Sequence, residues 1–183
     1  KIFLEKNQNV LIDKLDFSLT NDQKKTLEEI NKDLCSSKKM FRLLQGDVGS
    51  GKTIVSLLAA FNTIISGFQV SVMAPTEILA KQHYNLAKKL FPKNLNIQFI
   101  SGKSDYKTKK NILNKLSTNE IDIIFGTHAI FQKKVTYKNL GLIIIDEQHK
   151  FGVNQRKKLS DKGGNNCDVL LMTATPIPRT LTM

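Results

Sequence analysis

The most specific chemical pattern in the sequence is the segment 46–53, which matches GxxxxGK[ST] at every fixed position. Glycines let the chain curl so that successive backbone N–H groups face a phosphate chain, and the following helix N-terminus adds a partial positive charge. Lys52 would neutralise β- and γ-phosphate oxygens, and the Thr53 hydroxyl would bind Mg²⁺. The alternative is a glycine-rich turn with an accidental lysine. The residues expected to hold a nucleotide are Gly46, Asp47, Val48, Gly49, Ser50, Gly51, Lys52 and Thr53.

A second candidate is the acidic pair Asp146 and Glu147, which directly follows the apolar residues 142–145. Carboxylates at the carboxyl end of a parallel strand lie in the crevice where such sheets bind ligands. We expect Asp146 to hold Mg²⁺, directly or through water, and Glu147 to orient and deprotonate the attacking water. Alone, the pair could be ordinary polar residues at a strand end. Its position downstream of the phosphate loop favours a Walker B box.

Both candidates require a parallel sheet to support them. From residue 41 onward, short β-rich runs alternate with helical patterns, as in consecutive βαβ units. Several runs are almost continuously apolar, which is typical of strands covered on both faces. The sequence therefore predicts an α/β domain with a central parallel sheet flanked by helices. The expected strands are residues 41–45, 69–73, 97–101, 121–125, 142–145 and 169–172.

The helices between these strands have recognisable ends. Thr76 is a suitable N-cap for a helix that Pro92 closes, and Gly67 follows the helix that begins after the phosphate loop. Thr20 and Gln23 fit a capping box that opens a further helix ahead of the sheet. The expected helices are residues 21–34, 52–66, 76–91, 105–116 and 154–161. Residues 1–16 are expected to form a lead-in helix or linker, and residues 17–183 the ATP-binding domain.

Composition limits the possible partners. The 183 residues suit one domain, and a formal charge of +12 with a pI near 9.7 favours an anionic partner, nucleic acid first. A general lysine bias would raise the charge in the same way, and the lysine-dense segment 103–115 can be the solvated face of a helix. No apolar run approaches the roughly 20 residues of a membrane helix, so we expect no membrane partner and a cytoplasmic location.

Two further features concern the chain's context. Cys35 and Cys167 have no metal-binding spacing, so we expect two reduced thiols. Position 1 is lysine, and the last motif stops at Met183. We therefore expect a piece of a longer chain.

Additional motifs give the sequence a family resemblance. Segments 46–53, 126–128 (Gly-Thr-His), 146–149 (Asp-Glu-Gln-His) and 173–179 (Thr-Ala-Thr-Pro-Ile-Pro-Arg) resemble the ordered motifs of superfamily 2 helicases. The longer strings at 44–53, 73–83 and 146–153 resemble the RecG family of bacterial branched-DNA helicases. The resemblance covers residues 15–183 and implies a RecA-like P-loop NTPase domain. Its implied role is the first motor lobe of an ATP- and Mg-dependent enzyme that remodels replication forks and Holliday junctions in DNA repair and recombination.

The resemblance also implies roles for individual residues. Phe17, Leu19 and Gln23 would form an adenine pocket, although Phe17 can equally be a hydrophobic staple and Gln23 a capping-box residue. Residues that would contact the DNA backbone without reading bases are Pro75, Thr76, Gly126, Thr127 and His128. Residues that would couple the nucleotide to DNA are Gln148, His149, Thr173 and Thr175. His128 and His149 could instead be polar core residues, and His83 is expected at the surface.

Two alternatives to the RecG-like interpretation remain open. The motor of the transcription-repair coupling factor shares the segment at 173–180, but it usually differs at the positions of Gln148 and Ser50. A non-catalytic nucleic-acid-binding module is disfavoured by the intact residues Lys52, Thr53, Asp146 and Glu147. By resemblance, the partners are branched or forked DNA and, in the same longer chain, a second RecA-like lobe and a wedge domain. The whole protein is expected to be a monomer, and this lobe alone to hydrolyse ATP poorly.

Overall fold

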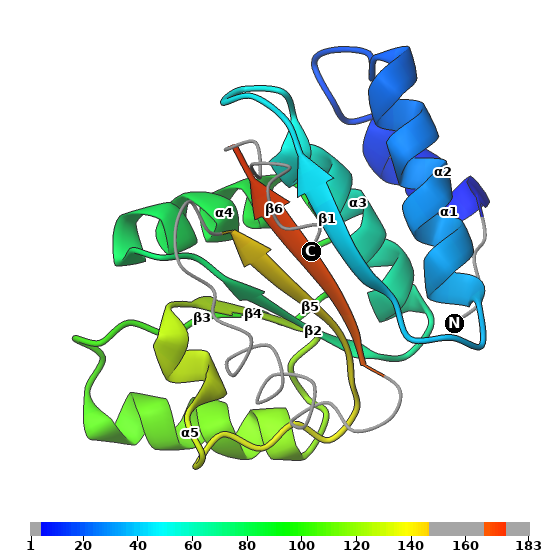
Figure 1. The fold of residues 1–183 in the computed structure, drawn as a ribbon. Coiled ribbons are helices and arrows are strands. Elements are labelled where there is room, and N and C mark those ends of the chain that lie inside the picture. Colours follow the sequence, from blue (N-terminus) through cyan, green and yellow to red (C-terminus); the bar gives the residue numbers. More distant parts are fainter. Residues whose placement is uncertain (1–4, 147–166, 175–183) are drawn as a thin grey trace, which may run out of the picture.

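The computed structural model describes residues 5–146 and 167–174, and these residues contain one six-stranded, all-parallel sheet with the strand order β1-β6-β5-β2-β4-β3 (Figure 1). The predicted parallel α/β sheet is confirmed, since each strand overlaps an expected run. The strands are β1 (Phe41–Gln45), β2 (Gln69–Met73), β3 (Ile97–Phe99), β4 (Ile123–Gly126), β5 (Leu140–Asp146) and β6 (Asp168–Thr173).

The helices begin where the sequence indicates. Thr20 forms the predicted capping box with Gln23, while Thr76 and Asp105 accept hydrogen bonds from Leu79 and Thr108 N–H groups. The expected helix at 154–161 lies outside the described residues. Within the described ranges, no helix has both the length and the hydropathy of a membrane span. The helical elements are α1 (Glu5–Ile12), α2 (Asn21–Cys35), α3 (Lys52–Ile65), α4 (Glu77–Leu90), α5 (Tyr106–Ser117) and the short 3₁₀ helix η1 (His128–Phe131).

Strand β3 ends earlier than the sequence predicts. Ile100 still donates to the Phe125 carbonyl of β4, but the Ser101 N–H bonds to Ser104 Oγ and turns the chain away. The Ser101 N–H, which faces away from β4, is thus satisfied within its own loop.

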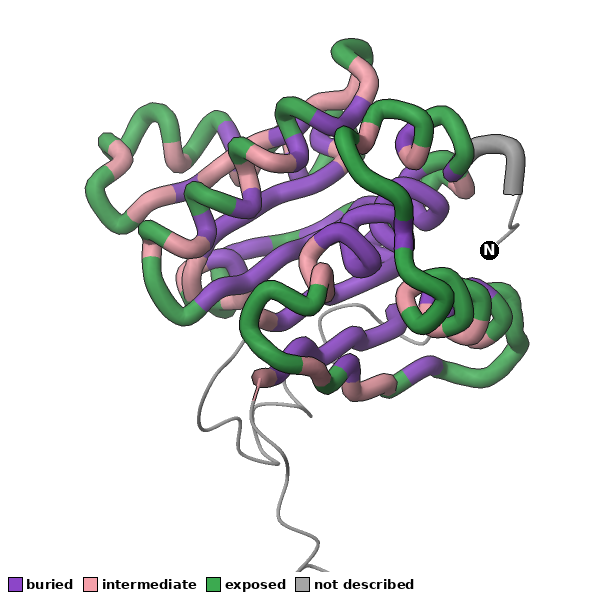
Figure 2. The backbone as a smooth tube through the Cα atoms, turned by 90° about the horizontal axis from the view of Figure 1, so that it is seen from above, coloured by how far each residue is buried: buried purple, intermediate pink, exposed green. Residues whose placement is uncertain are grey.

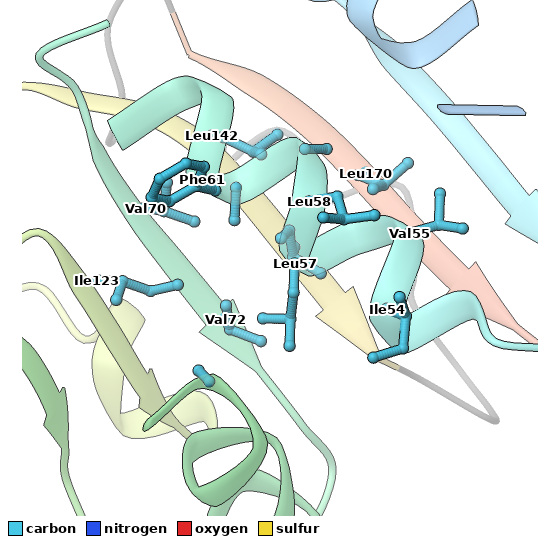
Figure 3. Packing of buried hydrophobic residues seen from close by; sticks show 14 of the residues in the cluster. Ile54, Val55, Leu57, Leu58, Phe61, Val70, Val72, Ile123, Leu142 and Leu170 are labelled. Atoms are coloured by element: carbon cyan, nitrogen blue, oxygen red, sulfur yellow. The ribbon is translucent and has the colours of Figure 1, made fainter. Parts of the chain in front are cut away.

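Most residues of the strands are buried (Figure 2). Alternate residues of each strand point to opposite sides, so both faces of the sheet are covered. On one face, α3 packs across three strands, and its side chains meet Val70, Leu142 and Leu170 (Figure 3). On the other face, Ile143 and Ile145 join a second core with α5 and η1. Burying each such aliphatic side chain contributes about 1.5–3 kcal/mol. Helices on both faces leave the strand ends as the accessible edges of the sheet.

Helix α1 packs into the first of these two cores, on the face of the sheet that α3 covers. Leu11 is fully buried in the cluster that α3 covers. The Gln8 amide donates to the Leu58 carbonyl at 2.9 Å, and the buried Asn31 side chain donates to Gln8 Oε1 at 3.0 Å. These buried polar groups are satisfied, so they fix α1 against α2 and α3 at little cost.

Candidate functional site

The carboxyl ends of the parallel strands bring the candidate residues to one edge of the sheet. Strand register pairs Gln45 with Thr173, Asp146 with Met172, and Met73 with both Ile145 and Gly126. In the order of the sheet, this edge carries the phosphate loop after β1, Thr173 of β6, Asp146 of β5, residues 74–76 after β2 and residues 127–128 after β4. Segments far apart in sequence therefore meet at the position where α/β sheets bind ligands.

The phosphate loop has a backbone that only glycine adopts easily at two positions. Gly49 and Gly51 have φ angles of 81° and 79°, in the left-handed region. At Gly51 a side chain would also collide, because a Cβ would lie 2.2 Å from the Gln23 Nε2 atom. Gly51 is the N-cap of α3, so the loop passes directly into the helix.

The Lys52 ammonium lies over this loop. Its Nζ donates to the carbonyl oxygens of Gly46 at 2.6 Å and Asp47 at 2.7 Å, and it lies 3.3 Å from Ser50 Oγ. These oxygens occupy the three donors of the ammonium. Thr53 follows in the first turn of α3 and is partly buried. The loop thus concentrates one cation and a helix N-terminus where a phosphate chain would bind.

A pocket of about 480 Å³ opens beside the loop, within the size range of small-molecule sites. It lies between the start of α2, the end of β1, the loop and the first turn of α3. Its lining residues are Thr20, Asp22, Gln23, Thr26, Leu44, Gln45, Gly46, Asp47, Gly49, Ser50, Lys52 and Val55.

The three adenine candidates have different environments. Gln23 Oε1 accepts the Thr20 N–H, and its Nε2 donates to the Ser50 carbonyl, both at 2.9 Å. The capping role of Gln23 is therefore confirmed, and the same amide joins α2 to the phosphate loop. Phe17 is about half exposed, just before α2, whereas Leu19 is buried in the hydrophobic core. The structure thus brings Gln23 to the pocket and leaves the Phe17 ring accessible.

Asp146 has a close partner that the sequence interpretation missed. Its Oδ2 atom lies 2.6 Å from His83 Nε2, and the Asp146 side chain remains 22% exposed. His83 was expected at the surface, but that expectation is wrong, since the residue is buried. On α4 it belongs to the inward-facing stripe of Ala80, Ala87 and Leu90, which are also buried. That helical spacing was the available signal, and a histidine in an apolar stripe indicates a polar partner within the core.

The oxygen donors at this edge fit a magnesium ion. Mg²⁺ prefers hard oxygen ligands and is usually bound by one or two carboxylates together with phosphates. Asp146 supplies a partly exposed carboxylate, and Thr53 supplies a hydroxyl in the first turn of α3. Glu147, the expected water-orienting residue, lies outside the described residues, as do Gln148, His149 and Thr175.

Thr173 lies between the phosphate loop and Asp146. It is buried at the end of β6, between β1 and β5 in the sheet. Its carbonyl accepts the N–H of Gly46 at 3.2 Å, so β6 contacts the first residue of the phosphate loop. One strand over, Asp146 is paired with its neighbour Met172.

The two segments expected to contact DNA lie side by side. The Ala74 N–H donates to the Gly126 carbonyl at 3.0 Å, which joins the chain after β2 to the end of β4. Pro75 and Thr76 are exposed, as is His128 at the start of η1, while Thr127 is partly exposed. The capping alternative is confirmed for Thr76, since its Oγ1 accepts the Leu79 N–H. Thr127 has no such capping bond.

Gly126 is required by close packing rather than by its backbone angles. A Cβ there would lie 2.6 Å from Ile130 Cγ2 and 2.9 Å from Ile100 Cγ2. The absence of a side chain therefore lets η1 fold back onto the end of β4.

A loop beside this surface is held by Glu77, the first residue of α4. The Glu77 carboxylate accepts hydrogen bonds from the Gly102 backbone N–H and from Ser101 Oγ. These bonds, the Gly102 bond first, lower the pKa of Glu77. Lys109 donates to the Gly102 carbonyl at 2.7 Å and closes the loop from the other side. The loop after β3 is thus joined to the start of α4.

Comparison with known proteins agrees with this geometry. Residues 20–183 match the DEAD/DEAH box helicase family, and the chain belongs to that family. Among individual proteins, it is similar to the ATP-dependent DNA helicase RecG of Streptococcus pneumoniae, with 53% identity over 91% of this chain and 25% of that protein. RecG of Bacillus subtilis is 52% identical over 93% of this chain and 25% of that protein. The chain therefore spans about a quarter of the length of these relatives.

Solved structures support the same conclusion. A structure of RecG bound to a three-way DNA junction matches with a TM-score of 0.86 and 43% identity, over 99% of this chain and 24% of that one. A structure of Mss116p bound to single-stranded RNA matches with a TM-score of 0.74 at 23% identity, over 95% of this chain and 39% of that one, and so shows the fold alone. The RecA-like helicase fold and the resemblance to RecG are confirmed.

Proposed function

We propose that this chain is the ATP-binding lobe of a RecG-like DNA helicase, which couples Mg-ATP hydrolysis to the remodelling of branched DNA during repair and recombination. The observation that carries the proposal is that the candidate residues lie together at the carboxyl ends of the strands. The phosphate loop, the acidic Asp146 and the exposed residues Pro75 and Thr76 all lie at the carboxyl ends of parallel strands in one sheet. A nucleotide and a DNA strand bound there would contact the same rigid element.

The residues of the chain divide the proposed ATP chemistry between them. The loop N–H groups and Lys52 hold the triphosphate, while Thr53 and Asp146 hold Mg²⁺. When bound, the metal neutralises phosphate charge. Glu147 orients the attacking water and accepts its proton. Holding these groups on neighbouring strand ends supplies positioning, which is the main protein contribution to phosphoryl transfer.

The pocket beside the loop is proposed to hold the adenine. Gln23 lines it, and its side-chain amide is of the type that reads the N6/N7 edge of the base. The accessible ring of Phe17 can stack on the base, and Leu19 supports this segment from the core. The hydrogen bond from Gln23 to Ser50 would then report base binding to the phosphate loop.

The adjoining surface is proposed to bind the DNA backbone. Exposed Pro75, Thr76 and His128 and the partly exposed Thr127 present polar side chains and backbone groups of the kind that contact phosphates. Gly126, also proposed for this surface, is buried and joins the two segments through its carbonyl. The net charge of +12 favours such a polyanion. Residues proposed to couple this surface to the nucleotide are Gln148, His149, Thr173 and Thr175.

The other domains of the longer protein are proposed from the similarity to RecG. The chain spans a quarter of the length of RecG, and the longer protein is proposed to carry a second RecA-like lobe and a wedge domain. That protein is proposed to be a monomer in the bacterial cytoplasm. The high identity to RecG supports this assignment over a translocase like the coupling factor. The presence of Lys52 and Asp146 opposes a non-catalytic binding module.

The test is ATP hydrolysis by the full-length protein with forked DNA, linear duplex or no DNA. We expect the largest stimulation by forked DNA, and we expect Lys52→Ala to abolish it without unfolding the protein, as measured by circular dichroism. Equal stimulation by forked and linear DNA would overturn the branched-DNA assignment. Near-normal turnover in a folded Lys52→Ala protein would overturn the assignment of the phosphate loop.

A further inference from the structure

A partly buried hydrogen bond connects α4 to Asp146 at the end of β5. His83 and Asp146 are 63 residues apart in sequence, yet His83 Nε2 and Asp146 Oδ2 are separated by only 2.6 Å. The His83 side chain is 9% exposed, compared with 22% for Asp146. The histidine thus approaches from the protein interior, while the carboxylate keeps an accessible side.

The chemistry of the pair specifies the direction of the bond. An ionised carboxylate only accepts hydrogen bonds, so Nε2 of His83 carries the hydrogen and donates it. A bond to one carboxylate oxygen restricts rotation of the group and leaves the other oxygen free. Carboxylates that bind metals are commonly held by such outer hydrogen bonds, whose removal costs about 10- to 100-fold in metal affinity or activity.

The backbone around His83 is suited to hold it in place. The neighbouring inward residues on α4 are Ala80 and Ala87, whose small side chains let the helix approach the sheet closely. The first turn of α4 is fixed by the Thr76 cap and by the bonds from Glu77 to the loop after β3. The imidazole therefore projects from a helix that is secured at its start.

We propose that His83 is a positioning residue, which holds the Asp146 carboxylate in the orientation needed to bind Mg²⁺. This inference rests on the proposed function, because it takes Asp146 to be a magnesium ligand. A purely structural alternative is that the pair only anchors α4 to the sheet. The two differ in outcome, since an anchor affects stability and all nucleotide binding alike, whereas a positioning residue affects the contribution of the metal.

The experiment uses two substitutions at His83 in the full-length protein. His83→Leu keeps much of the volume but removes the donor, and His83→Gln keeps a side-chain N–H that can reach the same oxygen. The measurement is the affinity for a fluorescent, non-hydrolysable ATP analogue, first with Mg²⁺ and then with EDTA. Thermal unfolding of each variant is recorded alongside.

We expect His83→Leu to reduce the gain in affinity due to Mg²⁺ by about 10- to 100-fold and to leave the affinity in EDTA within a few-fold of the parent. His83→Gln should restore the gain to within a few-fold. An unchanged gain in His83→Leu would refute the inference, as would an equal loss with and without metal. If His83→Leu does not fold, His83→Asn replaces it, because the shorter amide keeps a polar group that cannot reach Asp146.

Asp146→Asn separates this inference from the proposed function. It should abolish most of the gain due to Mg²⁺. If it leaves the gain intact, Asp146 is not a magnesium ligand and the proposed function fails at that residue. If Asp146→Asn removes the gain and His83→Leu does not, only the role of His83 is wrong.

Discussion

Gly51→Ala tests the junction between the phosphate loop and α2. The φ angle of 79° costs a residue with a Cβ about 1–2 kcal/mol. The new Cβ would also lie 2.2 Å from Gln23 Nε2 and would displace that side chain from the Ser50 carbonyl. Losing this hydrogen bond costs about 0.5–1.5 kcal/mol more. We therefore expect the free energy of unfolding to fall by about 1.5–3.5 kcal/mol.

The chain offers a matched control for this experiment. Gly67 has a φ angle of 87°, but a Cβ there would meet no atom within 4 Å. Gly67→Ala should therefore cost only the backbone term of about 1–2 kcal/mol. The assay is urea denaturation of the 183-residue chain, with each glycine substitution also made in a Gln23→Ala background. In the Gln23→Ala background, Gly51→Ala should lower the free energy of unfolding by no more than Gly67→Ala does. An excess cost that persists without Gln23 would refute the argument.

Three further predictions concern catalysis, DNA and pH. Glu147→Gln should keep the nucleotide affinity within a few-fold and reduce turnover by about 10² or more, since the amide cannot accept a proton; an equal collapse of affinity and turnover would mean that Glu147 holds the metal. Replacing Thr76 and Thr127 by alanine should weaken binding to two forks of unrelated sequence equally, with an unchanged salt slope, because neutral hydroxyls contact phosphates; Thr76→Ser with Thr127→Ala is the control that keeps the α4 cap. The lowered pKa of Glu77 means that its bonds to the loop after β3 stabilise the fold above pH 4.5 and lose this effect as the pH falls through the folded-state pKa. The difference in stability between the parent and Glu77→Gln should therefore vanish at acid pH, and a constant difference would contradict the assignment.

Local chemistry predicted much of the fold. Parallel strands with apolar faces were recognisable from their composition, and β1 and β2 have the expected bounds. The helix ends were equally predictable, because the side-chain oxygens of Thr20, Thr76 and Asp105 accept hydrogen bonds from backbone N–H groups only three residues away. The turn at 46–53 was recognisable for the same reason, since its glycine backbone angles are set within one short segment; its phosphate-binding role stays a prediction.

What the sequence did not reveal depends on distant pairs. His83 meets Asp146 only after β5 has been placed beside β2, and Glu77 meets Gly102 only after the chain following β3 returns to α4. Neither contact has a fixed spacing that a motif could encode. The burial of Leu11 likewise depends on the packing of α1 against α2 and α3. Long-range packing decided each of these features.

Helix α4 connects two of the proposed binding sites, and this connection has a thermodynamic consequence. Its first turn borders the proposed DNA surface, and His83, two turns later, contacts the proposed metal ligand. Coupling between two binding sites is reciprocal by thermodynamic necessity. If a bound strand displaces α4 and changes the affinity for Mg-nucleotide by some factor, Mg-nucleotide must change the affinity for the strand by the same factor. In that case α4 would couple the two sites together with the proposed coupling residues, and each binding or release of Mg-nucleotide would change the affinity for DNA.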